Sequence, residues 1–382
     1  MRHLRVSKKL RIAMIPTNVS GVSFYRMWQP AKALRSAGCE VALLWWSSKH
    51  FTMHKWEEDL CRDGVGQNIY RDVDMACQWA DVVIWMGLHT PYTLQLFKTM
   101  KTRHGKFFVT EMDDYIFSLP SSNIASTVYA PGSGLTQILI EQMKASDALV
   151  VSTPYLGELY KKFAKKVYVL ENVIDLSLWP VPASPAAGRR DVNIGWMGGG
   201  SHGDDFRVVE PAIRSIQEKF KNTRFTFVSG GVKPSFLDGI PRLKWVHDFR
   251  SIDRYPKWIG KFGFDIGMAP LQDNNFNRGK SNLRWLEHSA LGIPCVASPL
   301  PHFVESILPG ETGHLANTPH DWIYYIRELV SAPKLRDTIG KAARREIQDK
   351  WSLKTLGRKY KAAIEDMLNA RTNSPTDSGA HL

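Results

Sequence analysis

The most informative stretch of the chain is residues 265–298, DIGMAPLQDNNFNRGKSNLRWLEHSALGIPCVAS, in which a strand, a polar loop and a helix follow one another. An apolar strand ends at Ala269, and a helix is expected from about Ser281 to Leu291. Gly292 and Pro294 end that helix before the next strand begins. This order of elements is typical of an α/β protein with a parallel sheet.

The loop and helix of this stretch carry groups suited to a nucleoside diphosphate. Ser281 is a plausible N-cap, so free amides of the first turn, the helix dipole and the Lys280 ammonium would converge on an anion, with Arg278 on the same loop. The Glu287 carboxylate can accept both hydroxyls of a ribose diol. The alternatives are a solvated loop for Lys280 and Arg278, and a surface or salt-bridged carboxylate for Glu287.

Two series of apolar, β-branched or aromatic runs of strand length alternate with helix-like stretches. Near-continuous hydrophobic strands in this order are typical of a parallel sheet covered on both faces. We therefore expect an α/β fold with two doubly wound domains facing a central cleft, where ligands bind at the carboxyl ends of the strands. The expected strands are residues 11–17, 40–46, 81–86, 106–112, 148–153 and 166–170, followed by 192–197, 224–229, 243–246, 264–269 and 294–297.

A change of composition separates the two series. The stretch WPVPASPAAGRRD at residues 179–191 holds three prolines and several small residues, which is typical of a linker. The helical pattern after Asp321 breaks near Lys350 and Trp351. The expected organisation is a first domain at 1–180, a linker at 181–190, a second domain at 191–350, a C-terminal helix at 351–369 and a disordered tail at 370–382.

The glycines of residues 192–205, VNIGWMGGGSHGDD, lie between an expected strand and the helix after it. Gly198, Gly200 and Gly203 satisfy GxGxxG, a spacing that lets backbone amides approach a phosphate closely. A dinucleotide site would also need an acidic residue at the end of the next strand, which instead ends at Ser229. A phosphate-facing loop is therefore favoured over an NAD site or a purely structural turn.

The chain is basic, with 50 Lys and Arg against 37 Asp and Glu and a formal net charge of +13. Such an excess favours a polyanionic partner, namely nucleic acid, an anionic membrane or a phosphorylated acceptor, or else simply aids solubility. Two clusters could contact a phosphate backbone or an anionic membrane. They are Arg2, Arg5, Lys8, Lys9 and Arg11, and then Lys161, Lys162, Lys165 and Lys166.

The spacing of the cysteines and the hydropathy of the chain indicate in which cellular compartment the protein is expected. Cys39, Cys61, Cys77 and Cys295 lie far apart without a CxxC pair, so a zinc knuckle or redox dithiol is not indicated. No window reaches 18 consecutive apolar residues, and the apolar stretch behind the basic N-terminus is shorter than a signal peptide's core. We expect a cytoplasmic protein that could still contact a membrane peripherally.

Four segments resemble a known family. The loop at 18–21, ENVIDLSLW at 171–179, IGWMGGG at 194–200 and the stretch at 281–316 are similar to glycosyltransferases of the GT-B fold, in particular the retaining family four. The resemblance covers about residues 11–360. It implies two Rossmann-like domains, the first binding the acceptor and the second the donor, and an enzyme that moves a sugar from a nucleotide-sugar, expected to be a UDP-sugar, to a hydroxyl with retention.

The resemblance also implies donor-site residues. Members carry a Glu-x7-Glu pattern whose second Glu binds the donor ribose; Glu287 takes that place, while Gly279 occupies the first. Arg and Lys usually follow the first strand of the second domain, where Gly199 to His202 stand here, so Lys280 is expected to stabilise the departing diphosphate. The implied donor-binding residues are Gly21, Gly199, Gly200, Ser201, His202, Phe249, Arg278, Lys280, Ser281, Asn282 and Glu287.

Acceptor groups are expected at strand ends of the first domain. His89 follows DVVIWMGL, and Asp113 and Asp114 follow TEM. A hydroxyl acceptor benefits from a His or Asp that takes its proton, so Asp113 and His89 join Lys280 as catalytic candidates. Arg26, from the loop that includes GVSFYR, is a further acceptor-binding candidate. His89 is equally consistent with a structural role, and adjacent aspartates could hold a metal, although no obligatory metal is expected.

The loop GVSFYR and the segment EMDD are similar to glycosyltransferases encoded by bacteriophages. Several phage enzymes of this fold glycosylate hydroxymethylated pyrimidines in DNA. The expected acceptor is therefore a hydroxymethylated pyrimidine in phage DNA. The alternatives are a lipid or cell-envelope glycan acceptor, and an inactive relative that binds nucleic acid through its charge.

Overall fold

The computed structural model describes residues 9–17, 20–44, 69–121, 123–180, 191–248 and 254–372. The chain forms two compact units that are not simple halves of the sequence. The first comprises residues 1–112, 137–170 and 353–382, and the second comprises residues 113–136 and 171–352. The expected linker at 181–190 and residues 373–382 of the expected tail lie outside the described residues.

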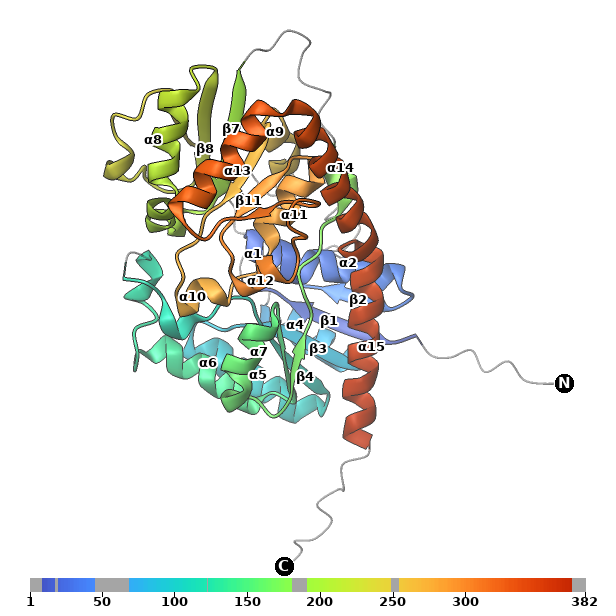
Figure 1. The fold of residues 1–382 in the computed structure, drawn as a ribbon. Helices are drawn as coiled ribbons and strands as arrows, with labels where there is room; N and C mark the ends of the chain where they lie inside the picture. The colour runs from blue at the N-terminus through green and yellow to red at the C-terminus, as the bar shows by residue number, and fades with distance from the viewer. Residues whose placement is uncertain are drawn as a thin grey trace, which may run out of the picture. The chain divides into compact units, whose positions relative to one another are not determined.

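The first unit is built on a six-stranded parallel sheet with the order β2-β1-β3-β4-β5-β6 (Figure 1). Each strand corresponds to one that the hydrophobic runs predict, so the first series is confirmed. The strands are β1 (Arg11–Ile15), β2 (Glu40–Leu43), β3 (Val82–Met86), β4 (Phe107–Met112), β5 (Ala148–Val151) and β6 (Val167–Val169).

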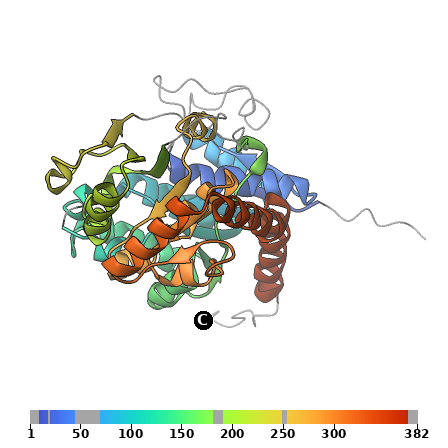
Figure 2. The ribbon, with the colours of Figure 1, turned by 45° about the horizontal axis from the view of Figure 1, so that its top comes forward.

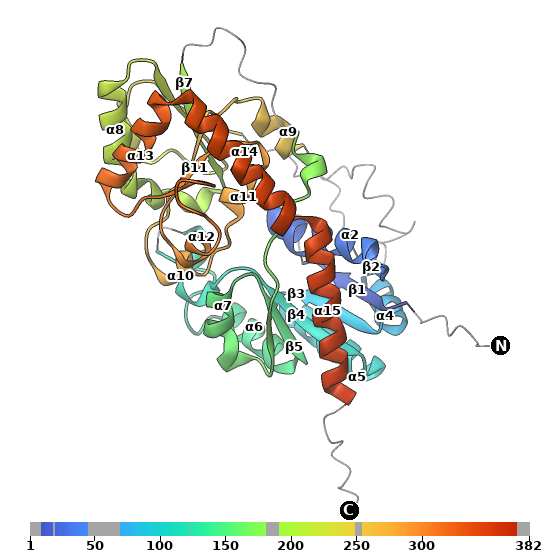
Figure 3. The same cartoon turned by 45° about the vertical axis from the view of Figure 1, so that its right-hand side comes forward.

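Helices cover both faces of this sheet, because its strands are apolar on both sides. Ala13 and Ile15 pack into one core with residues of α4 and α5. On the other helical layer α15 lies beside α2, as Figures 1 and 3 show, and Gly357 of α15 permits a close approach to the Ala33 backbone. The helices are α1 (Gly21–Ser23), the π-helix η1 (Phe24–Trp28), α2 (Gln29–Ser36), α4 (Ile69–Trp79), α5 (Pro91–His104), α6 (Gly134–Ala145), α7 (Pro154–Tyr160), η4 (Lys161–Phe163) and α15 (Leu353–Thr372).

The second unit contains another six-stranded parallel sheet, with the order β12-β11-β10-β7-β8-β9. The described residues between 191 and 352 run from yellow-green to red in Figure 2. The five expected strands are confirmed, and the sequence reading missed the two-residue strand β12. The strands are β7 (Val192–Gly198), β8 (Thr223–Ser229), β9 (Leu243–His247), β10 (Ile266–Ala269), β11 (Cys295–Ala297) and β12 (His314–Leu315).

Alternation along β7 divides the core of the second unit into two layers. Ile194 and Trp196 pack with α8 and α13, whereas Met197 packs with α9, α11 and α14. The helical pattern breaks at Trp351, between α14 and α15, as predicted. The helices are α8 (Glu210–Lys219), α9 (Tyr255–Gly260), α10 (Asn275–Arg278), α11 (Leu283–Ala290), α12 (Pro301–Val304), α13 (Pro319–Ser331) and α14 (Pro333–Lys350). The short 3₁₀ turns are η2 (Ile116–Ser118), η3 (Ile124–Ser126), η5 (Leu176–Leu178), η6 (Gly200–His202), η7 (Asp204–Val208) and η8 (Ser235–Leu237).

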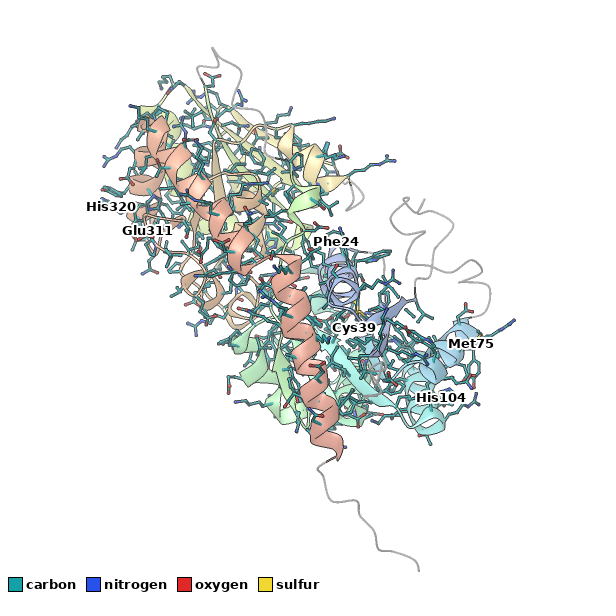
Figure 4. The ribbon with its side chains drawn as sticks, turned by 90° about the vertical axis from the view of Figure 1, so that its right-hand side faces the viewer. Phe24, Cys39, Met75, His104, Glu311 and His320 are labelled. Carbon is teal, nitrogen blue, oxygen red and sulfur yellow. The ribbon has the colours of Figure 1, made fainter. Side chains whose placement is uncertain are left out.

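The thiols of the described cysteines are buried and reduced. Cys39, labelled in Figure 4, lies directly before β2, and burial raises its pKa. Burial also raises the pKa of Cys77 to about 12. In the described parts of the chain, no helix combines the length and the apolar character needed to cross a membrane.

Candidate functional site

The strand order of the second sheet places a switch point between β7 and β10. The chain proceeds from β7 to β8 on one side, and β10 pairs with β7 on the other side. Ligands of open α/β sheets bind at such a point, beyond the carboxyl ends of the two strands. The turn after Gly198 and the loop at 270–282 both begin at this edge, and together they hold most of the predicted donor-binding residues.

The Gly-rich turn after β7 contacts a second glycine loop, which follows β8. A side chain on Gly231 would bring its Cβ within 2.6 Å of the Gly200 Cα, so the two backbones touch without intervening side chains. The amide of Gly230 donates to the carbonyl oxygen of Gly198 at 3.3 Å. Gly199, Gly200 and Ser201 are exposed, which leaves their backbone accessible to a ligand.

His202 is held in the turn by a buried carboxylate. Its Nδ1 lies 2.8 Å from Asp205 Oδ2, while Asp205 Oδ1 accepts from the Gln272 amide at 2.9 Å and from Asn277 Nδ2 at 2.8 Å. Burial lowers the pKa of His202, and the charges of Lys280 and Arg284 act in the same direction, against the raising effect of Asp205. Asp205 therefore joins the Gly-rich turn to the loop that carries Lys280.

Lys280 lies at this edge with a largely buried side chain, which is 15% exposed. Its Nζ is 4.3 Å from the centroid of the Phe276 ring and 3.9 Å from Asp114 Oδ1. A lysine ammonium in such surroundings keeps a compact positive charge next to the turn. The charge of Lys280 also acts on His202 of the turn, so the loop and the turn share one electrostatic environment.

The prediction that Ser281 caps the helix is wrong. The helix α11 begins at Leu283 with Asn282 in the N-cap position, and no side chain there accepts from the first turn. The Ser281 hydroxyl instead accepts from Asn172 Nδ2 at 2.8 Å, and Asn282 Nδ2 donates to Ser306 Oγ at 2.7 Å. Both side chains are engaged by residues distant in sequence, so they brace the loop.

Glu287 is buried on α11 and forms an ion pair with Arg284, three residues earlier. Arg284 Nη1 also lies 3.5 Å from the hydroxyl of Tyr255, on α9. Burial and the negative charge of Glu287 raise the pKa of Tyr255. Glu287 is therefore salt-bridged, as one alternative proposed. The ion pair lies within the candidate site. The sequence reading missed Arg284, the partner of Glu287 in this pair.

Arg278 forms an ion pair on the exposed side of its loop. Its guanidinium binds both carboxylate oxygens of Asp273, at 2.5 and 2.8 Å, and this pairing holds the pKa of Asp273 below its ordinary value. Its exposure agrees with the solvated-loop alternative, and its role at a diphosphate stays a prediction.

The second residue that the sequence reading missed is His302, on α12. Its ring is buried, and burial together with the positive charge of Lys280 lowers its pKa to about 3. A neutral imidazole therefore lies within electrostatic reach of Lys280. Little in the sequence indicates a role for His302, because a single histidine after a proline is common at the start of a helix.

In the first unit, Gly21 and Arg26 belong to the helical segment that follows β1. Gly21 opens α1 after the N-cap Ser20, whose side chain accepts from Ser23. Arg26 lies in the π-helix and is 1% exposed; its Nε donates to Glu111 Oε1 at 2.5 Å and its Nη1 to the Leu170 carbonyl at 2.7 Å. The Arg26 guanidinium is thus buried in an ion pair and does not present itself to an acceptor.

The other acceptor candidates follow strands β3 and β4. His89 is exposed and directly precedes Thr90, which caps α5. Asp113 and Asp114 follow β4 at the start of the segment that belongs to the second unit. Asp114 lies beside Lys280. Burial raises the pKa of Tyr129, and the negative charge of Asp114 raises it further.

Two further expectations concern Phe249 and a metal. Phe249, one of the implied donor-binding residues, lies outside the described residues. Among the residues that the structure describes, no group of three or more His, Cys, Asp or Glu side chains could hold a metal ion.

The fold defines the class of architecture. Two parallel six-stranded sheets with helices match the solved structures of GT-B glycosyltransferases. The model of the family described as glycosyl transferase-like matches residues 211–360, which include Lys280, Arg284 and Glu287.

Known proteins are similar to this chain over different lengths. A Bacillus subtilis (strain 168) protein described as a teichuronic acid biosynthesis glycosyltransferase, TuaH, is 26% identical over 171 residues, which are 42% of this chain and 42% of that protein. The match therefore covers less than half the length of this relative. Among solved structures, a glycosyltransferase of Rickettsia africae is 14% identical, with a TM-score of 0.63 over 94% of this chain and 99% of that one. Anabaena HepE, solved with UDP-glucose, is 11% identical, with a TM-score of 0.65 over 94% and 100%.

Proposed function

We propose that the protein is a glycosyltransferase that moves a sugar from a nucleotide-sugar to a hydroxyl acceptor. The observation that carries the proposal lies beyond the carboxyl ends of β7 and β10, where Asp205 ties the glycine turn to the loop of Lys280. At the same edge Arg284, the ion-pair partner of Glu287, approaches Gly198 at the start of the turn. Glycine backbone and an ammonium suit a diphosphate, and a buried carboxylate suits a ribose diol. The match of residues 211–360 to a glycosyl transferase-like family supports this reading.

The proposed chemistry is electrostatic. Breaking the bond between the sugar and the diphosphate places negative charge on the leaving group, and a preorganised cation stabilises that charge in the transition state. Lys280 is the proposed cation, and the exposed backbone of the glycine turn supplies amides. The proposed donor is a UDP-sugar, which the UDP-glucose bound by HepE of similar fold supports. Retention of configuration is proposed from the family resemblance.

On the acceptor side we propose that Asp113 or Asp114 orients the hydroxyl and takes its proton, with His89 as a further contact. Asp114 lies 3.9 Å from Lys280, so an acceptor hydroxyl at Asp114 would lie close to the departing diphosphate. A carboxylate within hydrogen-bond reach of the hydroxyl can act as its base.

A cell-envelope glycan is the acceptor that the relatives favour. The similarity to TuaH, described as acting in teichuronic acid biosynthesis, supports this class. An acid-bearing glycan would also meet the positive charge of this chain, formally +13. The buried, unpaired thiols of Cys39, Cys77 and Cys295 fit a reducing compartment, so we place the reaction in the cytoplasm.

A hydroxymethylated pyrimidine in phage DNA is the second candidate acceptor. It rests on the basic clusters, of which Lys161, Lys162, Lys165 and Lys166 are exposed near η4. The same lysines suit an anionic membrane, which would bring a lipid-linked acceptor to the enzyme. Arg2, Arg5 and Lys8 of the other cluster lie outside the described residues.

The acceptor is tested by measuring nucleoside diphosphate release from UDP-sugars in the presence of three substrates. These are envelope polysaccharide, hydroxymethylcytosine duplex DNA with a plain duplex as its control, and anionic liposomes carrying envelope lipids. We expect release and a hexose mass shift on the envelope glycan. Transfer confined to the hydroxymethylated duplex would replace this acceptor by DNA, and DNA binding without release would favour an inactive relative.

A further inference from the structure

The residues that directly follow β7, Gly199 to His202, include no lysine or arginine that could bind a phosphate. Arg284 brings a cation to the start of this turn. We propose that Arg284 binds the donor's diphosphate from the first turn of α11, while the same guanidinium holds Glu287 for the ribose. The inference rests on the proposed function, because it assigns a phosphate-binding residue to that same site. It replaces Arg278, which is exposed and paired with Asp273.

The guanidinium of Arg284 lies at the carboxyl end of β7. Its Nη2 is 3.1 Å from the point that a Cβ on Gly198 would occupy, and its central carbon lies 5.8 Å from the Trp196 ring centroid. Both Gly198 and Trp196 belong to β7, and Gly198 leads directly into the Gly-rich turn. The side chain of Arg284 is 18% exposed, so it is mostly enclosed but still reaches the surface.

Two cations act on the turn. Arg284 Nη2 lies 3.1 Å from the position of a Cβ on Gly198, and the positive charges of Arg284 and Lys280 both lower the pKa of His202, which lies within the turn. Two cations suit a group with two negative phosphates, whereas a single phosphate would need only one of them. We therefore assign the ligand as a diphosphate.

The planar fork of arginine allows the double role. Nη1 contacts the Glu287 carboxylate and approaches the Tyr255 hydroxyl, whereas Nη2 is directed toward Gly198. A guanidinium can bind two acceptors along different edges, which the point charge of a lysine does less well. Glu287 is thereby fixed in one orientation on α11, and the ribose hydroxyls would meet an ordered carboxylate.

Gly198 preserves the room for this contact. A Cβ at this position would lie 2.5 Å from the Trp196 ring and 3.1 Å from Arg284 Nη2, so a side chain would collide with both. The chain has glycine where the guanidinium approaches the backbone, so Arg284 can lie directly against the start of the turn.

The test is calorimetric titration of the full chain with UDP, GDP and ADP, followed by the monophosphate and nucleoside of the tightest binder. Arg284→Ala is expected to weaken diphosphate binding by roughly 10- to 100-fold, as for loss of a charged hydrogen bond, and nucleoside binding by a smaller factor, because Glu287 loses its partner. Arg284→Gln keeps a donor for Glu287 without the charge, so it should show the same loss of diphosphate binding with nucleoside binding changed by less than about threefold. Arg214→Ala, which removes an exposed arginine paired with Glu210 on α8, is the matched control and should bind like the wild type.

The outcomes separate this inference from the function on which it rests. A loss that is equal for the diphosphate and the nucleoside would overturn it, since Arg284 would then act only by holding Glu287. Unchanged binding by both Arg284 variants would also overturn it. If the wild-type chain binds none of the three diphosphates, the proposed function itself fails, whatever the variants do.

Discussion

At the scale of single residues, Lys280 is placed to receive an anion. Its distance of 3.9 Å from Asp114 exceeds the roughly 2.7–2.9 Å of a charge-assisted hydrogen bond, so the ion pair is loose. The Phe276 ring under the ammonium gives it an apolar support at 4.3 Å. A phosphate oxygen could therefore approach Lys280 and gain a stronger contact than the carboxylate offers.

Replacement of Lys280 by alanine is expected to lower the turnover number by roughly two to three orders of magnitude, the scale for loss of one preorganised charge donor. The rate of nucleoside diphosphate release at saturating donor measures this effect. Lys257→Ala, which removes an exposed lysine of α9, is the control and should keep the wild-type rate. A loss below about threefold for Lys280→Ala would contradict its assignment.

The sequence indicated Lys280, the glycine turn and Glu287 as candidates because their types and spacing reflect local chemistry. It could not identify Arg284 as a partner of the turn, since that contact joins α11 to β7 across about ninety positions of the chain. The same limit explains the error at Ser281. Its hydroxyl pairs with Asn172, and a local capping rule does not include partners so distant in sequence.

At the scale of elements, two glycines set how closely the α11 layer packs on the second sheet. A Cβ on Gly195 would lie 2.2 Å from the Phe264 ring, and one on Gly267 would lie 2.5 Å from the His288 ring. These positions are paired across β7 and β10. Bare backbone at both positions lets His288 and its helix approach the sheet, and this fixes the place of Glu287 on the same helix.

Gly267→Ala is therefore expected to lower the free energy of unfolding by about 1–3 kcal/mol, the usual cost of overpacking a filled core. Urea denaturation followed by circular dichroism measures the change. Gly134→Ala is the matched control, because a Cβ at this first residue of α6 meets nothing within 4 Å and should leave stability within about 0.5 kcal/mol. Equal stability of the two variants would show that α11 packs less tightly than described.

Hydrophobic runs predicted the longer strands well, since a strand buried on both faces must be apolar throughout. The strand β12 was not predicted because its two residues, His314 and Leu315, form no recognisable run. The break between α14 and α15 was visible in the sequence. The sequence did not predict that α15 packs against α2 of the first unit. An amphipathic pattern shows that one face of a helix is buried, but it does not identify the element that covers this face.

At the scale of the whole molecule, buried neutral histidines link stability to pH. Burial lowers the pKa of His288 and of His302 from 6.5 to about 3, with the charges of Arg284 and Lys280 contributing respectively. The unfolded chain binds protons at these histidines below about pH 6.5, whereas the folded chain does not until about pH 3. The contribution of these neutral histidines to the free energy of unfolding is therefore fully present above about pH 6.5, and it declines as the pH falls from there toward about pH 3.

Between about pH 5.5 and 4 we expect the free energy of unfolding to fall by roughly 1.4 kcal/mol per pH unit for each of these histidines. The His288→Gln variant should show a shallower slope than the wild type, whatever its absolute stability. Urea titrations at several pH values provide the slopes. Identical slopes for the two proteins would mean that His288 is protonated in the folded state.

The measurement that tests the central claim most directly is the balance between nucleoside diphosphate released and sugar transferred. The purified chain is incubated with a ¹³C-labelled UDP-sugar and envelope glycan, and both products are quantified by mass spectrometry. The account predicts equal amounts of the two, with both lost together in Lys280→Ala. Diphosphate released without labelled acceptor would indicate hydrolysis rather than transfer, and no release from any nucleotide-sugar with any acceptor would contradict the glycosyltransferase assignment.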